Sequence, residues 1–99
     1  MTPDLAAAVD RIATQAGWCA VQRDHEADRD PSKPWPRYAT DFHRDALVYA
    51  FAACHAADAG LCDISMALDR DSAAEMTGTR HPTAAQYAER VRAAVDQNR

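Results

Sequence analysis

Residues 46–54 read Ala-Leu-Val-Tyr-Ala-Phe-Ala-Ala-Cys, a run that is apolar on nearly every side of a helix. A surface helix keeps one polar face, whereas a helix that is apolar all round is surrounded by other elements. The run therefore predicts the central helix of an all-α bundle, extending over residues 40–59. Thr40 is expected as its N-cap, and Gly60 is expected in the left-handed position after its last turn.

Alanine is the commonest residue of the chain, with 23 copies among 99 residues, whereas Leu, Ile, Val and Phe together supply only 13. Alanine favours helix but buries little surface, so we expect closely approaching helices around a thin core. The large side chains of that core are expected to be Trp18, Trp35, Tyr38, Phe42, Tyr49 and Phe51. A thin core in so short a chain favours a homodimer or a stabilising partner.

Two further helices are predicted from their capping residues and apolar spacing. The first covers residues 1–21, where Thr2 and Pro3 form a start signal and Gly17 is expected to end or bend the helix. The last covers residues 83–98, where Thr83 and Gln86 have the spacing of a capping box. The expected buried stripes are Leu5, Ala8, Val9, Ile12 and Ala16 in the first helix, and Tyr87, Val91, Ala94 and Val95 in the last.

Residues 22–39 are predicted to form a loop. The run 22–30 is dominated by charge, and Pro31, Pro34 and Pro36 oppose regular structure after it. Trp35 and Tyr38 are expected to pin this loop onto the helices, although a proline-rich segment of this kind is also typical of a docking site for another protein.

Residues 61–80 are predicted to form a helix-turn-helix. Leu61, Ile64 and Leu68 share one helical face, residues 69–71 form the turn, and Ser72 opens the second helix with a capping box. The predicted fold is therefore one all-α domain over residues 1–99. It is a compact bundle of four or five helices with a helix-turn-helix-like corner.

Residues 44–81 resemble the C-terminal DNA-binding domain of the bacterial replication initiator DnaA and small phage proteins built on it. The resemblance consists of a long apolar helix, Ile64-x-x-Ala67-Leu68, then Arg70-Asp71 at the turn, and a helix that ends near Arg80. It implies that Arg70 contacts a base or a phosphate and that Arg80 contacts the DNA backbone. The chain differs from the family at residues 72–74, which are Ser-Ala-Ala in place of His-Thr-Thr, and at Asp69, where a glycine is usual.

The resemblance favours a small DNA-binding accessory or regulatory protein of bacterial or phage type, acting as a dimer on double-stranded DNA. Charge is divided along this part of the chain, with a balance of −3 over residues 61–77 and +2 over residues 78–99. Because phosphate contacts come largely from basic side chains, the C-terminal part is the better candidate for touching the backbone. The candidate DNA-binding residues are Arg70, Ser72, Arg80, His81, Arg90 and Arg92.

The alternative is an acidic protein-binding module without DNA affinity, comparable to phage proteins that inhibit a host nucleic-acid-binding machine. Nine acidic and six basic residues precede residue 61, within a net charge of −4 for the chain. Such a surface would attract a basic host protein. The candidate partner-binding residues are Trp35, Asp41 and Asp45.

No catalytic, cofactor or metal site is predicted. His43 lies between Asp41 and Asp45, but adjacent helical residues point in different directions, and no nucleophile motif or phosphate-binding glycine loop accompanies them. Cys54 and Cys62 lack the paired spacing of a structural zinc site. The chain is therefore not expected to be an enzyme.

The compartment expected from the sequence is the cytoplasm. Three cysteines without framework spacing indicate reduced thiols. The N-terminus lacks the basic segment of a signal peptide, and the apolar run 46–54 is too short to span a bilayer.

Overall fold

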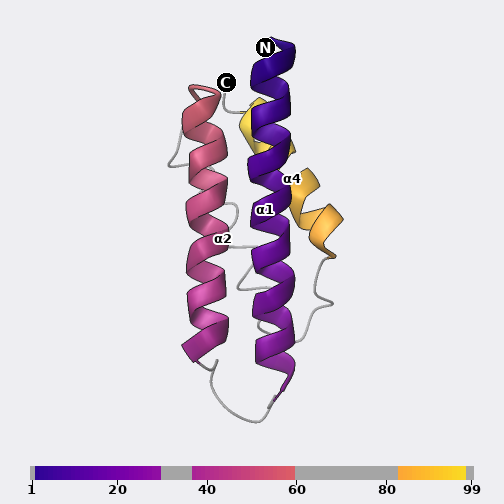
Figure 1. Cartoon of the computed structure of the whole chain (residues 1–99), viewed down its shortest axis with the longest axis vertical. Helices are drawn as coiled ribbons and strands as arrows, with labels where there is room; N and C mark the ends of the chain where they lie inside the picture. The colour runs from indigo at the N-terminus through magenta and orange to yellow at the C-terminus, as the bar shows by residue number, and fades with distance from the viewer. Residues whose placement is uncertain (1, 30–36, 60–82, 98–99) are drawn as a thin grey trace.

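The computed structural model describes residues 2–29, 37–59 and 83–97, and these residues form three helices and no strand. The helices are α1 (Pro3–Asp28), α2 (Arg37–Ala56) and α4 (Ala84–Gln97). Figure 1 shows α2 running antiparallel beside α1, with α4 against another side of α1. The all-α class is confirmed. The predicted helix-turn-helix over residues 61–80 and the predicted core residue Trp35 lie outside the described residues.

Helix α1 is longer than the sequence predicted. Thr2 caps its start by accepting a hydrogen bond from the Leu5 backbone N–H at 3.2 Å, and Pro3 occupies the first turn, as expected. The helix then passes through Gly17 and ends at Asp28, so the prediction of an end near residue 21 and a loop from residue 22 was wrong. The charged run continues the helix because two of its charged side chains, Arg23 and Asp24, are buried against the neighbouring helices.

Helix α2 is displaced by about one turn from its predicted bounds of 40–59. It begins at Arg37, so Thr40 lies inside the helix and is not its N-cap. At the other end, the Ala59 N–H donates to the Cys54 carbonyl at 2.8 Å and the Asp58 N–H donates to the His55 carbonyl at 3.1 Å. These two bonds form a Schellman motif, in which Asp58 takes the left-handed conformation (φ 53°) that had been expected of Gly60.

Helix α4 follows the prediction closely. The Gln86 N–H donates to the Thr83 hydroxyl at 3.2 Å, and the Thr83 N–H donates to the Gln86 side-chain carbonyl at 2.9 Å, which together form the expected capping box. Tyr87, Val91 and Val95 are fully buried, and Ala94 packs against the same core. The predicted stripe of α4 is therefore confirmed.

The core is built from small side chains. Its buried apolar residues are Val9, Ala13, Ala16, Cys19, Ala20, Ala39, Ala46, Ala50, Ala53, Cys54, Tyr87, Ala88, Val91 and Val95. The expectation of an aromatic core was wrong for Trp18, Tyr38 and Tyr49, which are 50%, 63% and 36% exposed. Helices whose contact face is alanine approach too closely to admit a large ring, so these side chains lie outside the contact.

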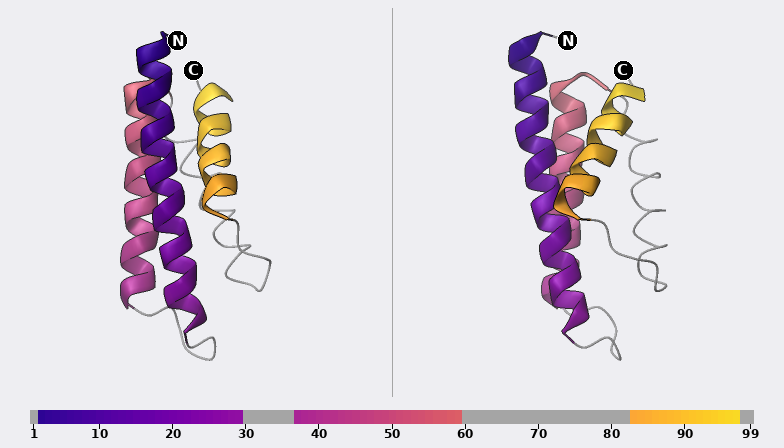
Figure 2. Two further views of the ribbon diagram at one scale, coloured as in Figure 1. Left: turned by 45° about the vertical axis from the view of Figure 1, so that its right-hand side comes forward. Right: turned by 90° about the vertical axis from the view of Figure 1, so that its right-hand side faces the viewer.

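Helix α1 is the hub of the described bundle. It packs against both α2 and α4, whereas α2 and α4 scarcely meet. In the left view of Figure 2, α1 lies between the other two helices. The prediction that the helix carrying residues 46–54 is central was therefore wrong for the described helices. One side of that run stays accessible, since Val48 is 56% exposed.

Gly17 marks a close approach of α4 to α1. A Cβ atom built at Gly17 would overlap the carbonyl oxygen of Ala84 and would lie 3.0 Å from its carbonyl carbon. Glycine costs a helix about 1 kcal/mol relative to alanine. Here it permits the contact between α1 and the first residue of α4.

We expect Gly17→Ala to lower the free energy of unfolding by about 1–3 kcal/mol, because the new methyl group meets backbone that cannot rotate away. Urea denaturation followed by circular dichroism measures the change. Gln15→Ala, at an exposed position of the same helix, is the control and should stay within about 0.5 kcal/mol of the parent. A more stable Gly17→Ala protein would contradict this packing.

Candidate functional site

Most of the candidate DNA-binding residues cannot be placed. Arg70, Ser72, Arg80 and His81 lie outside the described residues, and so does the candidate partner-binding residue Trp35. The structure places Arg90 and Arg92 on α4, and Asp41 and Asp45 on α2. The predicted DNA-contacting set is therefore seen only at its C-terminal end.

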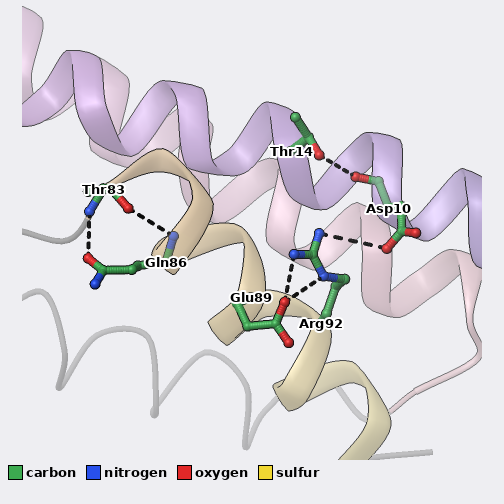
Figure 3. A network of polar contacts seen from close by, with 6 residues as sticks. All are labelled: Asp10, Thr14, Thr83, Gln86, Glu89 and Arg92. Carbon is green, nitrogen blue, oxygen red and sulfur yellow. Dashed lines mark hydrogen bonds and ion pairs between the residues drawn. The ribbon is translucent and has the colours of Figure 1, made fainter.

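Arg92 is engaged by carboxylates of its own chain. Its guanidinium donates to Glu89 through Nη2 at 2.7 Å and Nε at 3.1 Å, and its Nη1 lies 3.7 Å from Asp10 on α1 (Figure 3). Asp10 also accepts a hydrogen bond from Thr14 at its backbone carbonyl, at 2.8 Å. These ion pairs link Arg92 on α4 to Asp10 on α1 at the partly exposed margin of the bundle.

A buried arginine joins all three described helices. Arg23 on α1 is fully buried, and its Nε donates to Oδ1 of Asp24 at 2.9 Å. Its Nη1 lies 3.3 Å from Nδ1 of His43 on α2, and its guanidinium carbon lies 5.7 Å from the centre of the Tyr87 ring on α4. Because arginine only donates, Nδ1 of His43 is the acceptor in this contact.

This cluster is held by chemistry that only arginine supplies. The planar guanidinium of arginine can donate hydrogen bonds to a carboxylate and to an imidazole while one of its faces covers an aromatic ring. A buried cation is tolerated when it is paired and hydrogen-bonded, which Asp24 and His43 provide. The cluster connects the three described helices, with Arg23 fully buried and Asp24 nearly so.

We expect Arg23→Leu to lower the free energy of unfolding by about 3–5 kcal/mol, because it removes the guanidinium that pairs with the nearly buried Asp24. Arg29→Ala is the matched control, since Arg29 pairs with Glu26 at 3.1 Å from an exposed position. That pair should contribute less than about 1 kcal/mol. Urea titration of both proteins makes the comparison, and equal losses would show that Arg23 has no special role.

The two described cysteines are buried and reduced. Burial raises the pKa of the Cys19 thiol above its ordinary value of 9.0, and the nearby charge of Asp45 raises it further. Burial likewise raises the pKa of Cys54, against a smaller lowering by a backbone hydrogen bond. A thiol with a raised pKa is a poor nucleophile and a poor metal ligand at neutral pH.

Because folding raises both thiol pKa values, the folded state keeps its protons when the unfolded chain has lost them. The contribution of these two thiols to stability is therefore fully present below the unfolded pKa, and it falls as the pH rises above about 9 toward the folded pKa.

In a Cys62→Ser protein at neutral pH, we expect a disulfide reagent to modify the native thiols at least about tenfold more slowly than the urea-unfolded thiols. Equal rates would contradict the burial of Cys19 and Cys54.

An aromatic face covers the outer side of the α1–α2 pair. We define it by Trp18, Tyr38, Phe42 and Tyr49, of which Phe42 is half-buried and the others are exposed. Trp18 and Phe42 meet edge-to-face, with ring centres 6.1 Å apart and planes at 79°. The Trp18 ring therefore packs on Phe42 while half of the residue stays in solvent.

The sequence contained a signal for this face that the aromatic-core prediction missed. The buried alanines of α2 recur at residues 39, 46, 50 and 53, which defines the side of the helix that meets α1. Tyr38 and Tyr49 fall on another side of the same helix. The alanine spacing, rather than side-chain size, therefore identified the buried face.

Asp41 and Asp45 lie on α2 beside this face, and both are half-buried. Asp41 lies 3.6 Å from Arg44 and 4.0 Å from Arg37, and Asp45 lies 3.4 Å from Arg44. These are exposed pairs within one helix, which contribute little to stability.

Within the described ranges, no group of three or more His, Cys, Asp or Glu side chains is placed to hold a metal ion. None of the three described helices has the length and apolar character needed to cross a bilayer.

The chain matches no protein-family model, and comparisons with curated proteins and with solved structures gave no match.

Proposed function

We propose that the chain is a helical protein-binding module and that the aromatic face is its contact surface. One observation carries the proposal: Trp18, Tyr38 and Tyr49 are exposed together with Val48 on the α1–α2 pair. Aromatic side chains are enriched at protein interfaces, where they bury a large area with few rotatable bonds. Asp41 and Asp45 lie within the same region and add polar contacts.

The way the core is built supports this assignment. Alanine, valine and cysteine fill most of the contacts among the described helices, so the exposed rings of Tyr38 and Tyr49 are not needed there. The edge-to-face contact with Phe42 holds Trp18 in place before any partner arrives. A pre-positioned ring loses little conformational entropy on binding, which favours affinity.

The proposed architecture includes the helix-turn-helix over residues 61–80, which would complete a bundle of four or five helices. The proposed setting is a regulatory protein of bacterial or phage type in the cytoplasm. Duplex DNA is the competing partner, predicted from Arg70-Asp71 and the turn spacing.

We expect Trp18→Ala and Tyr49→Ser each to remove most of the protein partners that the immobilised chain retains, because each substitution deletes an anchor of the aromatic face. Loss of one well-placed aromatic anchor weakens an interface by about 2 kcal/mol or more. Affinity capture followed by titration of the purified partner by calorimetry gives the measurement.

Gln97→Ala, at an exposed position near the end of α4, is the control and should bind normally. Labelled duplex DNA is titrated in parallel by fluorescence anisotropy at low and moderate salt. Steeply salt-dependent DNA binding by all variants, with partner capture unaffected by Trp18→Ala, would replace the protein-binding proposal by the DNA-binding one.

A further inference from the structure

The contact between Arg23 on α1 and His43 on α2 forms in only one protonation state of the histidine. Nη1 of Arg23 lies 3.3 Å from Nδ1 of His43. A guanidinium has hydrogens to donate and no acceptor, whereas a neutral imidazole keeps one ring nitrogen as an acceptor. The contact is therefore a hydrogen bond only while Nδ1 carries no proton. A protonated His43 would turn an N–H toward the N–H of Arg23 and would place a second positive charge beside the first.

The guanidinium of Arg23 is held on its own side of this contact. Arg23 is fully buried, its Nε donates to Oδ1 of Asp24 at 2.9 Å, and its guanidinium carbon lies 5.7 Å from the centre of the Tyr87 ring. His43 is half-buried. Two like charges repel more strongly at such a position than in water, because little solvent lies between them. Protonation of His43 is therefore relieved most directly by moving α2 away from Arg23.

The charged groups that α1 and α4 turn toward this contact do not offset a second cation. Those from α1 are Arg23 itself and Asp24, and the group from α4, across the guanidinium, is the Tyr87 ring. Asp24 is paired with Arg23, so its single charge already balances that of the arginine.

The acidic groups on α2 itself lie two positions from His43 on either side. Asp41 lies 3.6 Å from Arg44, and Asp45 lies 3.4 Å from Arg44. Asp45 is also close enough to α1 for its charge to raise the pKa of Cys19. Because the side chains of Asp41 and Asp45 are 40% and 45% exposed, solvent screens their attraction for a protonated His43. The direct conflict with the buried guanidinium therefore decides the sign.

We propose that His43 is a pH switch that holds α2 against the charged last turns of α1 while its ring is neutral and releases them when the ring takes up a proton. This inference does not depend on the proposed function. Histidine is the side chain that ordinarily changes its charge near pH 6.5, so the switch operates between about pH 7.5 and 5.5. In Figure 1 the end of α1 and the start of α2 lie side by side, at the end of the bundle that the switch controls.

In acid, the unfolded chain binds a proton at His43 more readily than the folded chain does. The unfolded ring has the ordinary affinity of histidine, whereas folding requires the neutral ring. The stabilisation given by the Arg23–His43 contact is therefore fully present above about pH 7.5 and is lost as the pH falls through the histidine range. Carboxylates ordinarily titrate near pH 4, so this loss precedes theirs.

Urea unfolding at pH 7.5, 6.5 and 5.5, followed by circular dichroism, measures the effect. We expect the folding equilibrium constant of the parent chain to fall about fivefold from pH 7.5 to 5.5, because one proton is excluded from the folded state. In His43→Asn, the amide oxygen can accept the hydrogen bond of Arg23 near the place of Nδ1 and does not titrate. That variant should change less than about twofold. His55→Asn, at an exposed position of the same helix, is the control and should keep the loss seen in the parent.

A second measurement decides the matter in case His43→Asn does not fold. Proton NMR of the parent chain follows the assigned His43 ring signals as the pH is lowered, with and without urea. We expect the ring in the folded chain to take up its proton at a lower pH than the same ring in the unfolded chain.

Three results would overturn the inference. One is a folded His43 ring that takes up its proton at the same pH as the unfolded ring, or at a higher pH. Another is a parent chain whose stability does not decrease from pH 7.5 to 5.5. The third is a His43→Asn protein that shows the same fivefold loss as the parent, which would place the acid sensitivity at another group.

Discussion

The contact between the alanine faces of α1 and α2 is the constraint on which the remaining structure depends. Ala13, Ala16 and Ala20 of α1 are fully buried, which lets the two helices lie close together, and so are four alanines of α2: Ala39, Ala46, Ala50 and Ala53. Close approach brings Arg23 within reach of His43 and leaves no volume for a large ring between the helices. The aromatic side chains are therefore placed at the margin of the contact, where they form an accessible face. Packing with small side chains thus creates both the interior and the surface available to a partner.

The sequence predicted those features that depend on local chemistry. Helix starts at Thr2 and Thr83 follow from hydrogen bonds within a few residues, so their capping residues were sufficient to find them. The end of α1 was not predictable in this way, because its charged last turns are stabilised by His43 and Tyr87 from distant parts of the chain. The predicted end of α2 was wrong for a different reason. Asp58 occupies the left-handed region, so the nearest glycine, Gly60, was not a reliable marker of the helix end.

The candidate site was predicted only in part. The acidic character of the chain led us to expect that Asp41 and Asp45 contact a partner. Both residues lie on α2, beside the aromatic face. Trp18, Tyr38 and Tyr49 were assigned to the core because large apolar side chains are usually buried. That rule fails when alanine fills the contact, since the volume between the helices is then already occupied. The ion pair between Arg92 and Asp10 was not predicted, because the two residues lie some eighty positions apart in the chain, beyond the reach of any local pattern.

The position of α1 as the hub has a consequence for how the bundle opens. Since α4 is attached to the other described helices almost wholly through α1, it can separate as a unit while the α1–α2 pair stays intact. Such partial opening requires less free energy than unfolding of the whole bundle. It would expose the Tyr87 ring and allow water to reach the guanidinium of Arg23, which is otherwise sealed. Backbone amides of α4 are therefore expected to exchange their hydrogens with solvent earlier than those at the centre of α1.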